Sequence, residues 1–285
     1  MSRVAYVNGA YVSMDQASVH IEDRGYQFSD GVYEVVSIRR GKCIDMEPHL
    51  DRLWRSMNEL QIDEPMARGP MKVVMAETIR QNRLQDAILY IQVSRGVARR
   101  DHPFPADTVS SLVMTCRRFN FDAVKERAKT GIKVISQPDV RWGRCDIKSI
   151  SLLPNVLAKQ AAREQGGFEA LLIDADGYVT EGSSTNVWMV TSEGKLITRS
   201  TDDNILPGIT RASILSIAGE LQMPVEEHAF TLEEAKDATE MFLTSSTSCA
   251  MPITHIDSQA IGNGKPGPIV ARLVEQYWAM MDEAV

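Results

Sequence analysis

Residues 168–190 read FEALLIDADGYVTEGSSTNVWMV, and this stretch holds two expected strands joined by turns. Apolar residues predict one strand at 168–174 and another at 186–190, with a turn at 175–177. The segment 179–186 places the carboxylate of Glu181 beside Gly182 and small hydroxyl residues. Such a turn lets the backbone approach a ligand closely, but an ordinary polar hairpin loop has the same composition. Both interpretations stay open on this stretch alone.

Helices and strands alternate on both sides of this stretch. A helix is expected over 153–165, ended by two glycines, and another runs from Pro207-Gly208 to about residue 221. The capping box Thr231-x-x-Glu234 predicts a short helix. Strands at 132–136 and 240–244 and a terminal helix at 268–281 complete this half.

The first part of the chain also contains both expected helices and expected strands. Asn8-Gly9 predicts a tight hairpin, and a strand over 31–39 places Val32, Glu34, Val36 and Ile38 on one face and Tyr33 and Val35 on the other. Helices are expected at 48–60 and 71–84, and strands at 88–94 and 111–116. The short polar stretch 118–122 is the expected linker between a small domain, 1–117, and a larger one, 123–285. The class is therefore α/β or α+β with two domains.

Composition narrows the kinds of function. The chain has 285 residues and a net charge of −7, which argues against a nucleic-acid partner, because binding to phosphates needs a basic face. No apolar run suits a signal peptide or a membrane span, and the four cysteines are too far apart for a metal site. We expect reduced thiols, a cytoplasmic location, no membrane association and no bound metal.

Three segments could carry chemistry. Lys148, in the loop before the helix at 153–165, is either a desolvated amine that can form a Schiff base or a surface lysine. The helix that follows Leu206-Pro207-Gly208 would present the N–H groups of Ile209 and Thr210 to a phosphate, although ordinary helix starts look alike. A hydroxyl-rich turn at 244–248 could add donors to the same anion.

Two arginine-containing segments are also candidates. Arg52 is expected on the polar side of its helix, where it either reaches a phosphate or is solvated. Arg100 and His102 lie in a proline-braced loop over 95–105, which could grip a carboxylate or form an exposed Arg–Asp pair of little consequence.

In combination these motifs resemble the fold type IV family of enzymes that use pyridoxal 5′-phosphate (PLP), and within it the D-amino acid aminotransferases. The segments that carry the resemblance are 22–28 (EDRGYQF), 30–36 (DGVYEVV), 49–53 (HLDRL), 144–149 (RCDIKS), 181–184 (EGSS) and 208–211 (GITR). The resemblance covers nearly the whole chain and implies a small N-terminal α/β domain followed by a larger pseudo-barrel domain that binds PLP.

The resemblance also implies a role for each candidate. Lys148 would hold PLP as a Schiff base and, once released, act as the general base and acid. Glu181 would keep the pyridine nitrogen protonated, so that the ring accepts electrons from the substrate carbanion. The phosphate would lie against Arg52, Ser246 and the N–H groups of Ile209 and Thr210. Leu206 would pack on the ring, and Arg141 would support Glu181.

For the substrate, the resemblance implies a carboxylate clamp formed by Tyr33, Arg100 and His102. The loop that carries the last two is expected to come from the neighbouring subunit, which would make a homodimer necessary for activity. The expected reaction is transamination between a D-amino acid, such as D-alanine or D-glutamate, and pyruvate or 2-oxoglutarate.

Other functions stay open. A branched-chain aminotransferase, an (R)-amine aminotransferase and an aminodeoxychorismate lyase share the scaffold, although the pair Arg100 and His102 argues against the first two. A non-catalytic module that binds a phosphorylated ligand would keep Arg52 and the helix start but would have no need of Lys148 or Glu181.

Overall fold

The computed structural model describes residues 3–201 and 205–284 of the chain. Within them, residues 3–120, 147–151 and 284 form one unit, and 121–146, 152–201 and 205–283 form a second. The change of unit after Asn120 falls inside the stretch expected to be a linker, but only residues 119–120 of that stretch lie outside regular elements. That 118–122 acts as a domain linker stays a prediction. The predicted division used a single boundary near residue 120, whereas in the structure residues 147–151 also belong to the first unit.

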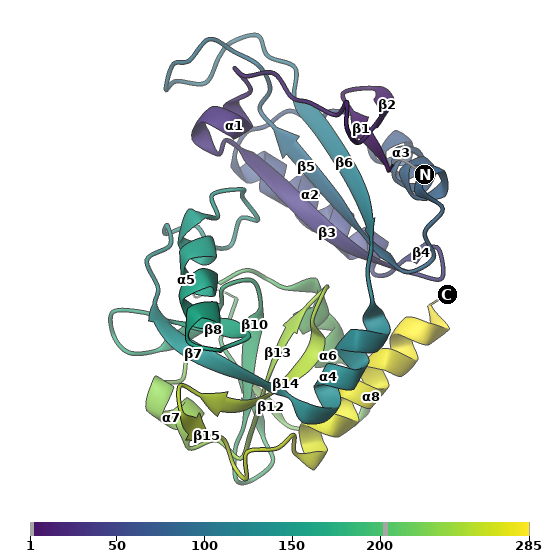
Figure 1. The fold of residues 1–285 in the computed structure, drawn as a ribbon. Coiled ribbons are helices and arrows are strands. Elements are labelled where there is room, and N and C mark those ends of the chain that lie inside the picture. Colours follow the sequence, from purple (N-terminus) through teal and green to yellow (C-terminus); the bar gives the residue numbers. More distant parts are fainter. Residues whose placement is uncertain (1–2, 202–204, 285) are drawn as a thin grey trace. The chain divides into compact units, whose positions relative to one another are not determined.

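The first unit is built on an antiparallel sheet with the strand order β2-β1-β6-β5-β3-β4 (Figure 1). Its strands are β1 (Val4–Val7), β2 (Ala10–Ser13), β3 (Gly31–Arg39), β4 (Lys42–Cys43), β5 (Ala87–Ser94) and β6 (Ser111–Arg118). Its helices are α1 (Arg24–Phe28), α2 (Met46–Glu59) and α3 (Arg68–Asn82). The hairpin between β1 and β2 turns at Asn8 and Gly9, both at positive φ, which confirms the prediction for that dipeptide.

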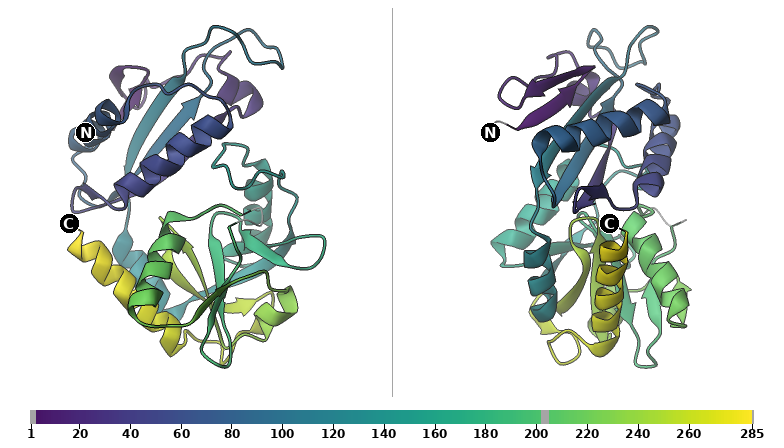
Figure 2. Two further views of the ribbon diagram at one scale, coloured as in Figure 1. Left: turned by 180° about the vertical axis from the view of Figure 1, so that it is seen from behind. Right: turned by 90° about the vertical axis from the view of Figure 1, so that its right-hand side faces the viewer.

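Helices α2 and α3 cover one face of this sheet, as two further views make clear (Figure 2). The alternation predicted for β3 is confirmed, because Val32, Val36 and Ile38 are fully buried in the core beneath the helices. Tyr33 and Val35 lie on the other face and are only half-buried. Neither α2 nor α3 covers this second face of the sheet, and only the short helix α1 lies near it.

The second unit is built on a curled nine-stranded sheet with the order β12-β11-β10-β13-β14-β7-β8-β9, to which β15 is added at β14. The strands are β7 (Ile132–Pro138), β8 (Glu169–Ile173), β9 (Val179–Gly182), β10 (Asn186–Val190), β11 (Leu196–Thr198), β12 (Val225–Glu227), β13 (Glu240–Ser245), β14 (Cys249–Ile256) and β15 (Gln259–Ala260). The helices are α4 (Phe121–Thr130), α5 (Leu153–Glu164), α6 (Ile209–Glu220), α7 (Leu232–Lys236) and α8 (Pro268–Glu283).

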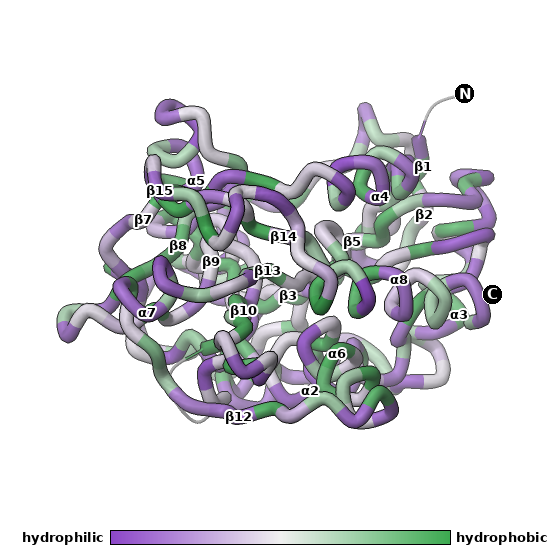
Figure 3. The backbone as a smooth tube through the Cα atoms, turned by 90° about the horizontal axis from the view of Figure 1, so that it is seen from below, coloured by the Kyte–Doolittle hydropathy of each residue, from purple (hydrophilic) through white to green (hydrophobic). Residues whose placement is uncertain are grey.

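Apolar residues form the inside of the curled sheet. Strands β10 and β13 carry mostly hydrophobic residues, whereas the short helix α7 at the periphery is mostly hydrophilic (Figure 3). Helix α7 starts at the predicted capping box, in which Thr231 and Glu234 each accept from the other's backbone N–H. No helix in the described ranges is both long and apolar enough to cross a membrane.

Several elements differ from the sequence-based expectations. Helix α4 was not predicted, although its buried residues Phe121, Val124 and Ala128 recur at helical spacing. The five-residue helix α1 is too short to show a periodic pattern in the sequence. Strand β14 was not predicted because it contains Pro252, and proline argues against a central strand. The stretch 179–182, expected to be part of a polar turn, is the fully buried strand β9.

Candidate functional site

The second unit holds a buried carboxylate at the end of β9. Glu181 is 5% exposed and accepts hydrogen bonds from Asn186 Nδ2 and from the backbone N–H of Leu206, both at 3.2 Å. It also pairs with Arg141 through a close contact between Nη1 and Oε1. Asn186 starts β10 only a short turn after the end of β9, and this turn brings it to Glu181. The structure therefore brings together Glu181, Arg141 and Leu206, which the sequence placed in one site.

Arg141 is itself held by an acid that the sequence analysis missed. Its Nε lies 2.8 Å from Asp139 Oδ1 and its Nη2 lies 2.6 Å from Oδ2, while Thr180 Oγ1 donates to the same carboxylate at 2.7 Å. Burial alone would raise the pKa of Asp139, but the hydrogen bonds and charge of Arg141 outweigh it, so the pKa lies below its usual value. Burial would lower the pKa of Arg141, yet the two carboxylates raise it above its usual range. The guanidinium is thus a fixed positive charge beside Glu181.

The start of helix α6 lies next to this carboxylate. The N-cap is Gly208, and no side chain of the described residues caps the first turn, so its N–H groups can bind an anion. A Cβ at Gly208 would come within 2.0 Å of Asn186 Oδ1, which explains why a glycine occupies the cap. Ile209 and the buried Thr210 open the helix, as the sequence predicted.

Ser246 lies in the turn between β13 and β14. In the sheet register Asn186 pairs with Thr244, so this turn projects from the same end of β10 and β13 as Asn186 does. Asn186 therefore lies against the start of α6 and beside the strand end that leads into this turn, although the sequence predicted it only as the start of a strand. Its position directly after the glycine-serine stretch was the signal that could have identified it.

In the first unit, Lys148 is tied to the strand that carries Tyr33. The Tyr33 N–H donates to the carbonyl of Lys148 at 3.0 Å, and the Ile150 N–H donates to the carbonyl of Gly31 at 3.0 Å. The segment 147–151 thus runs beside the start of β3, where Ser149 and Val32 form an isolated antiparallel β-bridge. The Lys148 Nζ lies 4.4 Å from the centre of the Tyr33 ring, so both side chains occupy the face opposite α2 and α3.

Arg52 departs from its predicted environment. We expected it on the polar side of α2, reaching a phosphate or solvated, but it is only 7% exposed and pairs with Glu34 on β3. Its Nε and Nη2 lie 2.8 and 2.9 Å from the two carboxylate oxygens, and His49 Nδ1 lies 2.7 Å from Glu34 Oε2. The prediction of a solvated face was wrong because Glu34, a polar residue on the buried face of β3, draws Arg52 inward.

The charge of Glu34 is stabilised by its neighbours. Burial alone would raise the pKa of this carboxyl, but the charge of Arg52 and the hydrogen bonds from Arg52 and His49 hold it well below its usual value. Glu34 and His49 were not singled out from the sequence as site residues, although both lie within the quoted segments.

Arg100 and His102 lie on an exposed loop of the first unit. The Arg100 Cζ is 5.0 Å from the centre of the Phe28 ring, and the rings of His102 and Phe28 are 5.6 Å apart. The structure therefore brings these two predicted residues together. Within the described part of the chain, no hydrogen bond or ring contact joins either of them to Tyr33 of the same chain.

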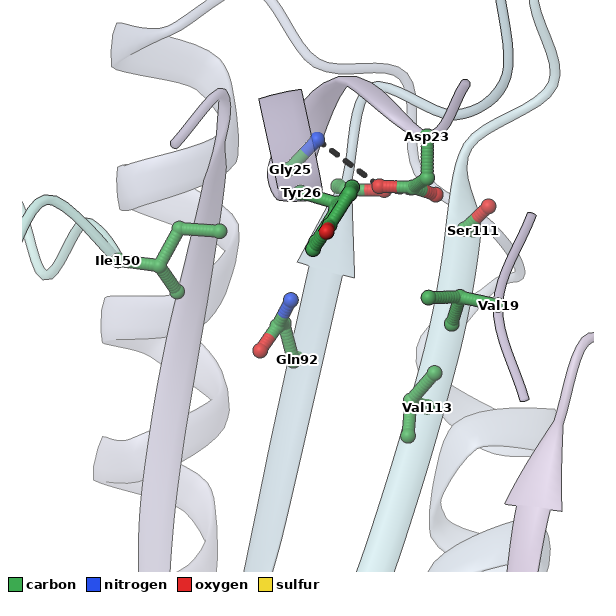
Figure 4. Close-up of a pocket in the computed structure, with 9 residues that line it drawn as sticks. Val19, Asp23, Gly25, Tyr26, Gln92, Ser111, Val113 and Ile150 are labelled. Carbon is green, nitrogen blue, oxygen red and sulfur yellow. Dashed lines mark hydrogen bonds between the residues drawn. The ribbon is translucent and has the colours of Figure 1, made fainter. Parts of the chain in front are cut away.

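A hollow with a volume of about 320 Å³ lies on the uncovered side of the first sheet (Figure 4). Gln92 of β5 and Val113 of β6 form its floor, and Tyr26 of α1 and Ile150 of the Lys148 segment lie at its sides. Because Gln92 pairs with Tyr33 in the sheet register, the hollow adjoins the residues around Lys148. The described residues contain no cluster of side chains able to hold a metal ion.

Comparison with known proteins gives a consistent family. A model of the family described as amino-transferase class IV matches residues 31–256. The D-alanine aminotransferase of Bacillus licheniformis is 41% identical over 262 residues, which is 92% of this chain and 91% of that protein. The D-alanine aminotransferase of Staphylococcus haemolyticus is 36% identical over 272 residues, 95% of either chain.

Solved structures share the fold. The branched-chain amino acid aminotransferase from Escherichia coli superposes with a TM-score of 0.88 at 22% identity, covering 98% of this chain and 94% of that one. The branched-chain aminotransferase from Thermoproteus uzoniensis gives a TM-score of 0.87 at 26% identity, with the same coverage. At such identities the likeness establishes the architecture of the chain and does not by itself distinguish the substrate.

Proposed function

The chain belongs to the class IV aminotransferase family, and on that premise we propose that it is a D-amino acid aminotransferase dependent on PLP. It would transfer the amino group of a D-amino acid, such as D-alanine or D-glutamate, to pyruvate or 2-oxoglutarate. The observation that carries this proposal is the 41% identity, over 92% of the chain, to a protein named D-alanine aminotransferase.

The residues of the second unit fit PLP. Glu181 is buried and its negative charge is stabilised by Arg141. A carboxylate that pairs with a protonated pyridine nitrogen needs to carry this charge. The first turn of α6, which no side chain of the described residues caps, offers the N–H groups of Ile209 and Thr210 to a phosphate. We assign Ser246 to the same phosphate and Leu206 to the ring. When bound, PLP supplies an electron sink that stabilises negative charge at the Cα of the amino acid.

The first unit supplies the remaining groups of this proposal. Lys148 would hold the cofactor through its Nζ and would carry a proton to and from the substrate Cα. Its backbone hydrogen bond with Tyr33 and its place beside the Tyr33 ring support the assignment, because they fix the direction from which the amine acts. Arg52 is assigned to the cofactor phosphate, and its pairing with Glu34 would set the orientation of the guanidinium.

The preference for D-amino acids would follow from the position of Lys148, which transfers the proton on one side of the substrate. Because Lys148 acts from a single side, the side on which the substrate carboxylate is held decides which enantiomer reacts. We assign the carboxylate to Tyr33, Arg100 and His102, which offer a phenol, a guanidinium and an imidazole. Substrates that lack the carboxylate would leave these polar groups without a partner and bind poorly.

A homodimer is part of the proposal. Arg100 and His102 are exposed and have no contact with Tyr33 of their own chain within the described residues, as expected if they serve the site of a second subunit. Large apolar side chains between 40% and 87% exposed lie in this loop and in the segments on either side of it, namely Val97 and Phe104 in the loop and Ile21, Tyr26 and Val109 beyond it. Exposed apolar groups in such number support a subunit contact there.

A cytoplasmic location completes the proposal. Cys116 and Cys249 are buried, and Cys43 and Cys145 are half-buried, as suits thiols kept in a reducing compartment.

A branched-chain aminotransferase is the second candidate, because solved enzymes of that name share the fold at TM-scores up to 0.90. The pair Arg100 and His102 favours the D-amino acid enzyme instead, on the reasoning that links these residues to the substrate carboxylate.

A visible absorption spectrum tests the proposed function. The purified protein with PLP should show the absorption of the bound cofactor, and D-alanine should bleach it while L-alanine should not. Bleaching by L-alanine or an L-branched-chain amino acid alone would move the enzyme to the second candidate. A protein that stays colourless after incubation with PLP would refute the proposal.

A further inference from the structure

The side chain of Arg24, at the start of α1, joins two distant parts of the first unit. It is 3% exposed, and its guanidinium divides its bonds between one acid and two carbonyls. Its Nε lies 2.8 Å from Asp30 Oδ2, its Nη1 donates to the carbonyl of Asp101 at 2.6 Å, and its Nη2 donates to that of His102 at 3.2 Å. Arg24 therefore binds the backbone of the loop that carries Arg100 and His102.

A second buried arginine anchors the beginning of the same loop. Arg95 shares Asp30 with Arg24, with its Nε 2.7 Å from Oδ2 and its Nη2 3.0 Å from Oδ1. It also donates to the carbonyls of Leu60 and Gln61, each at 2.7 Å. Asp30 binds both guanidinium groups and compensates one of their two positive charges, while backbone carbonyls accept from the remaining nitrogens of the cluster.

The backbone around α1 is also joined to this loop. The Arg24 N–H donates to the carbonyl of Gly96 at 2.9 Å, and the Ala98 N–H donates to that of Glu22 at 3.3 Å. Asp23, between them, caps α1 by accepting from the Gly25 N–H, a bond drawn in Figure 4. The start of α1 is thus fixed in its own right, so it can serve as a support for the loop.

The aromatic ring of Phe28, one turn along α1, meets the side chains of the clamp. The Cζ atoms of Arg24 and Arg100 lie 4.8 and 5.0 Å from its centre, and the His102 ring lies 5.6 Å away. Arg100 is exposed and would otherwise sample many rotamers, at a cost in entropy when it binds a carboxylate. A ring that restricts both side chains removes part of that cost.

We propose that Arg24 is a positioning residue for the carboxylate clamp, holding the backbone at Asp101 and His102 so that Arg100 and His102 rest on Phe28. The inference deepens the proposed function and rests on it for the identity of the substrate. Arg24 itself need not touch the substrate, so its effect should fall on substrate binding and not on the chemistry at Lys148.

Arg24→Ala in the PLP-loaded enzyme is the direct test. We expect the KM for D-alanine to rise about tenfold or more, while kcat changes less than about threefold and the cofactor absorption is unchanged. Amide hydrogen exchange in residues 97–104, measured on the same sample, should become faster by about tenfold, because the two carbonyl bonds are lost. Unchanged exchange in this segment would overturn the proposal.

Two further variants guard against a simple loss of folding. Arg24→Lys keeps the charge beside Asp30 but cannot bond the acid and both carbonyls together, so its KM should be intermediate. Phe28→Leu keeps an apolar side chain and should raise the KM without faster exchange at the backbone. A fall in kcat at unchanged KM in Arg24→Lys would contradict a positioning role.

Arg99→Ala is the matched control, because it removes an exposed arginine from the same loop and no contact of Arg99 is present in the described residues. It should leave both KM and exchange near the wild-type values. If the wild-type enzyme proves inert toward D-alanine, the proposed function fails, whereas the exchange measurement still decides whether Arg24 holds the loop.

Discussion

At the scale of single residues, two buried carboxylates of the site each face an arginine. Glu34 pairs with Arg52, and Glu181 pairs with Arg141. Such pairs contribute little net stability when complete, because desolvation of both charges offsets their attraction, but the loss of one partner leaves an uncompensated charge. The pairs therefore orient the guanidinium groups more than they hold the fold together.

The pair of Glu34 and Arg52 gives a pH-dependent prediction. Because the native pKa of Glu34 is lowered, its stabilising contribution is fully present above the unfolded value of 4.5 and is lost as the pH falls below it. Glu34→Gln should lower the free energy of unfolding by about 3–5 kcal/mol at pH 7, where Arg52 loses its counter-charge. The difference from wild type should shrink below about pH 4, as denaturant titrations at several pH values would reveal.

Glu47→Gln is the control for this measurement. Glu47 is exposed on the same helix and pairs with Lys72 at the surface, so its loss should change stability little at any pH. A difference between wild type and Glu34→Gln that stayed constant from pH 7 to pH 3 would argue against the assigned pKa.

At the scale of elements, the start of α6 shows how a backbone shape creates a site. The helix begins at a glycine because Asn186 occupies the space where a side chain would stand, and Asn186 in turn donates to Glu181 and to the carbonyl of Leu206. One glycine thus couples the helix start, which suits a phosphate, to the buried carboxylate, which suits a pyridine nitrogen.

Gly208→Ala should disturb both ends of this arrangement. The added Cβ would meet Asn186 Oδ1 at 2.0 Å, so we expect a stability loss of about 1–3 kcal/mol and weaker binding of PLP. Titration of the apoprotein with PLP, followed by absorbance, measures the second effect. Gly219→Ala, in the same helix but with no atom near the new Cβ, should be neutral or slightly stabilising. Equal PLP affinity in the two variants would show that Gly208 has no role in binding PLP.

At the scale of the whole molecule, the proposed homodimer makes each site depend on two chains. Lys148 and Tyr33 lie on one face of the first sheet, whereas Arg100 and His102 lie on an exposed loop without contact to them in the described residues. If the site needs both sets, as proposed, it would be complete only when a second copy supplies the loop.

Subunit complementation tests this dependence. Lys148→Ala and Arg100→Ala should each have very low activity with D-alanine as homodimers. After denaturation and joint refolding, half of the dimers would be hybrids with one intact site, so about a quarter of the wild-type activity should return. No recovery, with hybrids demonstrated by mass, would place Arg100 in the site of its own chain.

The sequence by itself determined the family, the order of most elements and the identity of the chemical groups, because these depend on local patterns. The hairpin at Asn8-Gly9, the two faces of β3 and the capping box of α7 need only neighbouring residues, and the structure confirms them. Only the tertiary structure decided that Arg52 is buried against Glu34, that Asp139 holds Arg141, and that Arg24 holds the loop of Arg100 and His102. The contacts of Arg52 and Arg24 join residues that are distant in the sequence, and how sheets and helices pack sets the choice of partner for such a buried charge. Asp139 and Arg141 are only two residues apart, but packing brings both to Thr180 and Glu181 on β9.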